Sequence, residues 1–106
     1  MRTLDYSVKN QRLTKVGDHT MLVSGTKGYL QARFEFDDNW TGCKKVACFY
    51  NNGESYAVRL DDNNKCVIPP EALTSSSFKV SVEGRKKDYC IPSTIVEETQ
   101  IVRREI

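Results

Sequence analysis

Few residues of this chain have the types and the spacing that catalysis requires. The single histidine, His19, lies between Asp18 and Thr20 in a polar segment, without a nucleophile motif around it. Carboxylates are adjacent at three places, Asp37/Asp38, Asp61/Asp62 and Glu97/Glu98. The first two pairs fall on expected turns, where aspartate caps and solvates the backbone. We therefore expect His19 to be a surface residue, no residue to be catalytic and the protein not to be an enzyme.

Metal and cofactor sites are not predicted either. Of the four cysteines, only Cys43 and Cys48 are close in sequence, whereas a zinc site usually combines two such pairs. The oxygen-rich run 61–64 lacks the spacing of a calcium loop, and the run 25–28 lacks the glycine spacing and the helix of a phosphate loop. We expect a hairpin turn at 25–28, four free thiols including Cys66 and Cys90, and no cofactor.

Charge and hydropathy limit the partners. Basic residues cluster at 44–45, 85–87 and 103–104, but 16 basic residues are balanced by 14 acidic ones to a net charge of +2. This balance disfavours nucleic acid as a partner. No apolar run approaches the roughly 20 residues of a membrane span, and the polar segment 1–6 does not begin a secretory signal peptide. We expect a cytoplasmic protein that does not enter a membrane.

Strict alternation of apolar and polar residues predicts strands along nearly the whole chain. In Leu30–Phe36, one face is apolar (Leu30, Ala32, Phe34 and Phe36) and the other is polar. Expected strands are Thr3–Val8, Thr20–Ser24, Tyr29–Phe36, Lys45–Tyr50, Ser55–Leu60, Lys65–Ile68, Ser77–Glu83, Asp88–Ile91 and Glu98–Val102. Turn residues at 51–53 and 61–64 predict two hairpins, so that the three strands they join form a meander.

These elements predict one domain, residues 1–106, with an all-β fold. About eight short strands with turns at regular intervals favour an immunoglobulin-like antiparallel β-sandwich, with a small β-barrel as the alternative. The expected core contains Phe34, Phe36, Val58, Leu60, Phe78, Val80 and Val82. Trp40 precedes all four cysteines, unlike the tryptophan of a true immunoglobulin domain. It either closes one end of this core or stacks on a ligand.

The order of core and turn residues from Tyr29 to Ile101 resembles a group of phage proteins. Its elements are Phe34-Glu35-Phe36, Trp40-x-Gly42, Lys45-x-Ala47-x-Phe49, Tyr56-Ala57-Val58-x-Leu60, Ile68-Pro69-x-Glu71-x-Leu73 and Phe78-Lys79-Val80-Ser81-Val82-x-Gly84. This order is similar to small β-sandwich proteins and domains encoded by phages and prophages of Gram-positive bacteria, often near tail and baseplate genes. The resemblance implies a location in the cytoplasm of a bacterial host, and in the virion if the protein is a tail component.

Three functions are consistent with the sequence. The first is a non-enzymatic tail or baseplate component that acts by protein–protein contacts as a homo-oligomer or with another protein. The second is a small phage-encoded anti-defence inhibitor of a host enzyme, and the third is a carbohydrate-binding module with a glycan as its partner. The residues most suited to an interface or a ligand are Trp40, Tyr50, Tyr56 and Tyr89.

Overall fold

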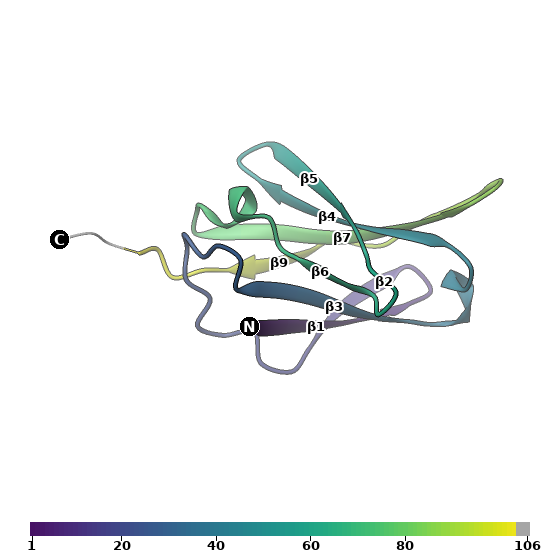
Figure 1. The fold of residues 1–106 in the computed structure, drawn as a ribbon, viewed down its shortest axis with the longest axis horizontal. Helices are drawn as coiled ribbons and strands as arrows, with labels where there is room; N and C mark the ends of the chain where they lie inside the picture. The colour runs from purple at the N-terminus through teal and green to yellow at the C-terminus, as the bar shows by residue number, and fades with distance from the viewer. Residues whose placement is uncertain (104–106) are drawn as a thin grey trace.

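The computed structural model describes residues 1–103, which form two packed β-sheets (Figure 1). The sandwich prediction is therefore confirmed, and the sheets do not close into a barrel. Arg104 of the third basic cluster, like the rest of 104–106, lies outside the described residues. The strands are β1 (Arg2–Lys9), β2 (Arg12–Val16), β3 (Leu30–Phe36), β4 (Lys44–Asn51), β5 (Glu54–Arg59), β6 (Lys65–Val67), β7 (Ser77–Lys86), β8 (Tyr89–Pro92) and β9 (Val96–Thr99).

The first sheet has the strand order β2-β1-β3-β6 and contains one parallel pair. β1 runs parallel to β3, from Arg2 opposite Leu30 to Val8 opposite Phe36, while β2 runs back antiparallel to β1. The return loop, residues 17–29, therefore has to cross from the end of β2 past β1 to the start of β3. The predicted strand Thr20–Ser24 is wrong, because this return segment contributes only a bridge between Val23 and Ile101. The predicted hairpin at 25–28 is also wrong, since this run is part of the same return loop.

The second sheet has the order β5-β4-β7-β8, and β9 pairs with the other half of β7. The hairpin predicted at 51–53 is confirmed, with positive φ angles of 52° at Asn52 and 78° at Gly53. The meander is wrong at its third strand. Asp61 binds the backbone N–H groups of Asn63 and Lys65 in a tight turn, and this turn sends β6 to the first sheet, beside β3.

The core lies between the sheets and includes every predicted member. Phe34, Leu60, Phe78, Val80 and Val82 are buried, and the other two pack against them from half-buried positions. Trp40 belongs to the short 3-10 helix η1 (Asp38–Trp40), where its side chain is 0% exposed and closes one end of the core. A second short helix, η2 (Pro70–Leu73), buries Ala72 and Leu73.

One long side of the sandwich is sealed where β2 meets the segment around β9. The Thr94 hydroxyl accepts a hydrogen bond from the backbone of Leu13, and the Thr94 N–H donates to the Gln11 carbonyl at 2.7 Å. Gln11 also donates through its side chain to the Pro92 carbonyl. These contacts use backbone groups of the β2 edge that would otherwise face solvent.

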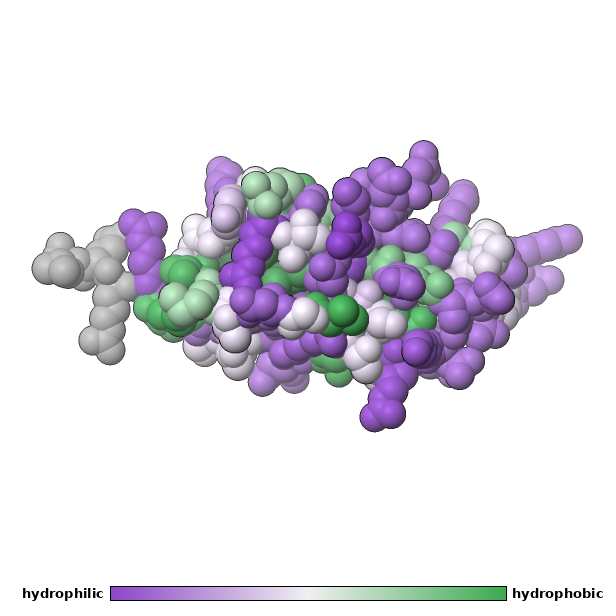
Figure 2. All heavy atoms as spheres, turned by 90° about the horizontal axis from the view of Figure 1, so that it is seen from below, coloured by the Kyte–Doolittle hydropathy of each residue, from purple (hydrophilic) through white to green (hydrophobic). Residues whose placement is uncertain are grey.

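The two ends of the molecule differ in polarity. Figure 2 shows hydrophilic side chains over the end that carries the β7–β8 hairpin, and apolar side chains near the last described residues at the opposite end. Exposed apolar residues of the return loop and the C-terminal segment include Met21, Val23 and Ile101. Within residues 1–103, no helix is long and apolar enough to cross a membrane.

Candidate functional site

The structure separates the four aromatic residues that the sequence offers as a site. Trp40 donates its indole N–H to the Asn10 carbonyl at 2.7 Å and has no exposed face. The ligand-stacking alternative for Trp40 is therefore wrong, because a bound ring would have to displace the core. Phe36 covers one side of the indole at 5.0 Å between ring centroids, and Gly84 of β7 lies beneath it.

The three tyrosines lie apart from one another. Tyr50 is on the outer face of the second sheet, where its hydroxyl is 2.8 Å from the Ser81 hydroxyl. Tyr56 is on the inner face, since it is paired with the core residue Phe49. Tyr89 is on the β7–β8 hairpin and donates its hydroxyl hydrogen to the Asn39 carbonyl at 2.9 Å. The predicted set does not form one site.

His19 is not the surface residue that the sequence suggests, because its side chain is only 7% exposed. Its Nδ1 atom is 2.5 Å from Glu98 Oε2, and its Nε2 atom is 2.9 Å and 3.0 Å from the carbonyl oxygens of Asp5 and Val16. Both ring nitrogens thus lie within hydrogen-bond distance of oxygen atoms of the chain. The return loop thus places His19 in contact with β1, β2 and β9.

Glu98 is the centre of this buried cluster, with 1% of its side chain exposed. Its Oε2 atom also accepts the Tyr6 hydroxyl at 2.6 Å, and Lys15 Nζ lies 3.2 Å from Oε1 in an ion pair that lacks hydrogen-bond alignment. Burial, reinforced by the negative charge of Glu98, raises the pKa of Tyr6 far above its ordinary range. Glu98 lies on β9 and its partners lie on β1, β2 and the return loop, so the cluster ties the two sheets together.

A histidine–carboxylate pair is also the geometry of a general base, but the arrangement here does not suit one. His19 is held by backbone carbonyls on the side opposite Glu98, and Glu98 itself is sealed from solvent. Sequence reasoning missed Glu98 and Lys15. The available signal was the position of Lys15 two residues after Leu13, which puts a charge on the inner face of a strand.

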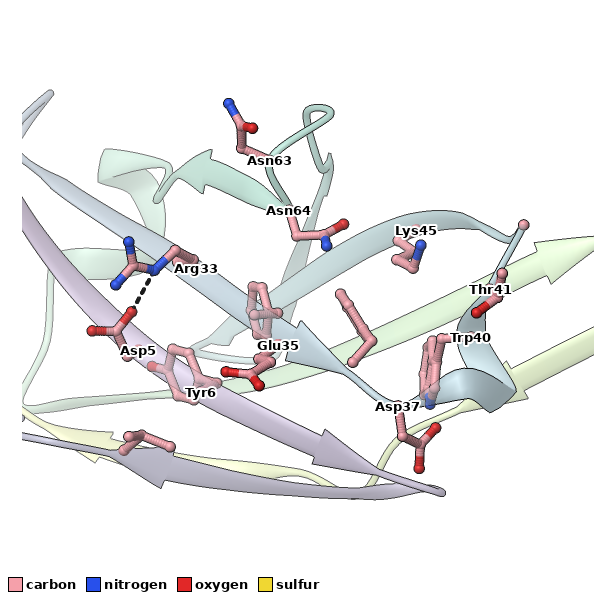
Figure 3. A pocket seen from close by; sticks show the side chains of 14 residues that line it. Asp5, Tyr6, Arg33, Glu35, Asp37, Trp40, Thr41, Lys45, Asn63 and Asn64 are labelled. Atoms are coloured by element: carbon pink, nitrogen blue, oxygen red, sulfur yellow. Dashed lines mark hydrogen bonds and ion pairs between the residues drawn. The ribbon is translucent and has the colours of Figure 1, made fainter.

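A shallow groove of about 700 Å³ lies between β3, η1 and the start of β4 (Figure 3). Four of the five charged side chains that line it, all except the exposed Glu35, have partners within residues 1–103. Arg33 Nε is 2.7 Å from Asp5 Oδ1, Lys45 Nζ lies 5.2 Å from the Phe36 ring centroid, and Asp37 accepts the backbone N–H groups of Asn10 and Asn39. The bond from Asn10 is the main reason why the pKa of Asp37 is lowered. The groove therefore offers a polar surface rather than reactive groups.

The four cysteines are free. Cys43 and Cys66 are buried, Cys48 is half-buried and Cys90 is exposed. Burial raises the pKa of Cys66 to about 12, and Glu83, whose carboxylate accepts the Cys90 thiol at 3.0 Å, raises the pKa of Cys90. High pKa values disfavour the reactive thiolate. In residues 1–103, no three histidine, cysteine, aspartate or glutamate side chains gather as a metal site.

The free edge of β5 is the remaining candidate. Among residues 1–103, β5 pairs only with β4, and the Leu60 N–H, just beyond its end, donates to the Lys45 carbonyl at 3.0 Å. Hydrogen-bonded pairs alternate in an antiparallel ladder, so Glu54, Tyr56 and Val58 direct their backbone groups toward β4. The backbone groups of Ser55, Ala57 and Arg59 point away from the sheet, and within residues 1–103 no hydrogen bond satisfies them.

The other edge strands are protected. β2 carries the inward-pointing Lys15 and is bonded to Thr94. β6 has three residues and is followed by Pro69 and Pro70, and β8 ends at Pro92. β9 is joined to the first sheet through Glu98. Short strands, proline and inward charges are devices that prevent pairing with another chain. The six-residue β5 is longer than β6 and β8, contains no proline, and has its charged residues Glu54 and Arg59 exposed at its two ends.

Comparison with protein-family models, curated proteins and solved structures finds no match to this chain.

Proposed function

We propose that this protein acts by protein–protein contacts, made by strand addition at the free edge of β5. The observation that carries the proposal is the contrast between β5 and the protected edges on either sheet. An edge strand with free N–H and C=O groups is a template for a strand of another chain, and strand addition is a recurrent mode of recognition. The proposal includes no catalytic step, in keeping with the burial of the His19–Glu98 pair.

The biological setting that we propose is a tail or baseplate component of a phage or prophage. It rests on the resemblance of the core and turn residues to such proteins. A sandwich that recruits a strand at one edge suits assembly, since each contact leaves the other faces available.

Quantitative affinity purification from cells that carry the gene tests this proposal. Ala57→Pro removes an outward-pointing N–H without touching the β4–β5 ladder, because proline is tolerated on an edge strand where its nitrogen faces solvent. Ala57→Ser keeps the N–H and is the matched control. We expect a stoichiometric protein partner with the wild-type and Ala57→Ser chains, and its loss with Ala57→Pro. Circular dichroism checks that both variants are folded.

The identity of the partner separates the alternatives. A virion protein, or the chain itself, supports the assembly role, whereas a host defence enzyme would support the inhibitor. A protein that binds a glycan, and whose protein contacts do not change in Ala57→Pro, would refute the proposal.

A further inference from the structure

We infer that the strand which the β5 edge recruits is β5 of a second copy, so that a two-fold axis at Ala57 joins two five-stranded sheets. This inference rests on the proposed function and names its partner. Two copies related by a two-fold axis perpendicular to the sheet pair in antiparallel fashion, with inner faces on the same side. Residues directly opposite each other must then share a face.

The outward-pointing backbone groups select the register. Pairing Ala57 with Ala57 of the second copy also places Ser55 opposite Arg59, so all three outward-pointing residues of each strand form hydrogen-bonded pairs. Moving the axis to Tyr56 would pair Ser55 with Ala57, but would leave Arg59 opposite Gly53, in the turn before the strand. The register centred on Ala57 therefore uses the free backbone groups most completely.

The side chains of β5 complement themselves in this register. On the inner face, the half-buried Tyr56 lies opposite Val58 of the second copy, an aromatic and β-branched pair that favours sheets. On the outer face, two small Ala57 side chains meet at the axis. Arg59 of one copy lies opposite Ser55 of the other on this outer face, and Glu54 belongs to the inner face, so like charges are not opposed.

The size of the contact predicts how it behaves. One pair of six-residue strands buries less surface than the roughly 1,200 Å² of a standard stable interface, so we expect a dimer that depends on concentration. Sedimentation velocity over a concentration series should show a monomer–dimer equilibrium for the wild-type and Ala57→Ser chains. Ala57→Pro should weaken dimerisation at least tenfold.

Disulfide trapping tests the register. In a Cys90→Ser background, which removes the exposed thiol, Tyr56→Cys and Val58→Cys chains are oxidised separately and as a mixture. Residues 56 and 58 are directly opposite in the proposed register, at a pair without backbone hydrogen bonds, where side chains are closest. We expect the covalent dimer to form in the mixture and not in either sample alone.

The remaining outcomes each contradict a specific statement. A covalent dimer from Tyr56→Cys alone would place the axis at Tyr56 and refute the register. A chain that stays monomeric at every concentration, while Ala57→Pro still abolishes capture of a different protein, would refute the inference and leave the proposed function intact. If Ala57→Pro changes neither self-association nor capture, both proposals fail.

Discussion

Glu98 receives contacts from three side chains that are distant in the sequence. Tyr6 and His19 reach one carboxylate oxygen, and Lys15 reaches the other. A carboxylate that is 1% exposed needs such partners, because burial of an unpaired charge costs several kcal/mol. Lys15 is 38% exposed, so it can also reach water, whereas Tyr6 and His19 depend on Glu98.

Replacing Glu98 with glutamine should destabilise the protein by about 2 kcal/mol, the scale of a hydrogen bond to a charged group. The amide preserves the shape of the side chain but has one acceptor oxygen in place of two and no negative charge for Lys15. Urea unfolding measures the change. Glu97→Gln is the matched control, since Glu97 is the exposed neighbour and its substitution should leave stability unchanged. Equal effects of the two substitutions would contradict the role of the buried cluster.

Alkaline pH should destabilise the fold through Tyr6 and Cys66. Their ordinary pKa values are 10.0 and 9.0, and the folded state raises both. As the pH rises through the ordinary values, the unfolded chain releases protons that the folded chain retains, so stability is present below this range and declines above it. Urea midpoints should therefore fall between about pH 8 and about pH 10.5.

Substitution of Tyr6 by phenylalanine should make the alkaline decline shallower, although the lost bond to Glu98 lowers stability at neutral pH. Tyr29→Phe is the control, because Tyr29 is 55% exposed. Absorbance at high pH should show that one of the five tyrosines does not ionise until the protein unfolds. Ionisation of all five tyrosines in the folded protein would refute the raised pKa of Tyr6.

At the scale of the elements, Trp40 of η1 packs directly against Gly84 of β7. A Cβ atom on Gly84 would lie 2.8 Å from Trp40 Cε3, closer than Cβ atoms approach, and 3.1 Å from Cys43 Cβ, which is also a tight contact. Glycine is therefore needed here for close packing, while the strand continues through it to Lys86. The sequence suggests that Gly84 ends the strand, but the hairpin turn follows three residues later, where Lys87 has a φ of 42°.

Gly84→Ala should destabilise the protein by about 1–3 kcal/mol, as insertion of a methyl group into a packed core does. Circular dichroism follows the unfolding of every variant, since Trp40 is the single tryptophan and Trp40→Phe removes its fluorescence. Trp40→Phe alone should also be destabilising, but it makes space for the new methyl group. The double variant should then be less destabilised than the sum of the two single variants. Strict additivity would show that the indole does not limit residue 84.

The elements that could be predicted from sequence are those whose alternation is uninterrupted. β3, β5 and β7 have apolar residues at every second position, so both their existence and their inner faces are readable. β4 is apolar on both faces from Val46 to Tyr50, so its pattern predicts the strand but not which face is buried. β2 was missed because Lys15 takes an inward position and breaks the pattern. Its ion-pair partner is Glu98, on a strand at the other end of the described chain.

Pairing between distant segments could not be predicted. The turn at 61–64 has the same residues whether β6 continues the second sheet or crosses to the first, and the parallel pairing of β1 with β3 has no local signal. The free edge of β5 could not be predicted either, because it depends on which strands lie beside β5. The sequence does predict contacts with another protein through a strand edge or a sheet face, and such contacts are what we propose.

At the scale of the whole molecule, one long side of the sandwich is sealed and the β5 side offers a free strand edge (Figure 1). The apolar end described above adds a second difference, along the long axis. A domain with one open side can add a single neighbour at that side without forming a filament, because an isologous contact closes on itself. This asymmetry favours defined assemblies over open-ended aggregation.

The buried carboxylate also has a consequence for the synthesis of the chain. Tyr6 and Glu98 are 92 residues apart, so the first sheet leaves the ribosome long before the residue that completes its interior. Until then, the Tyr6 hydroxyl and His19 have no carboxylate, and β2 lacks the segment that covers its edge. The nascent domain can fold only in part, and the final closure waits for β9. Because of the order of translation, β1 can complete its buried contacts only after β9 has been synthesised.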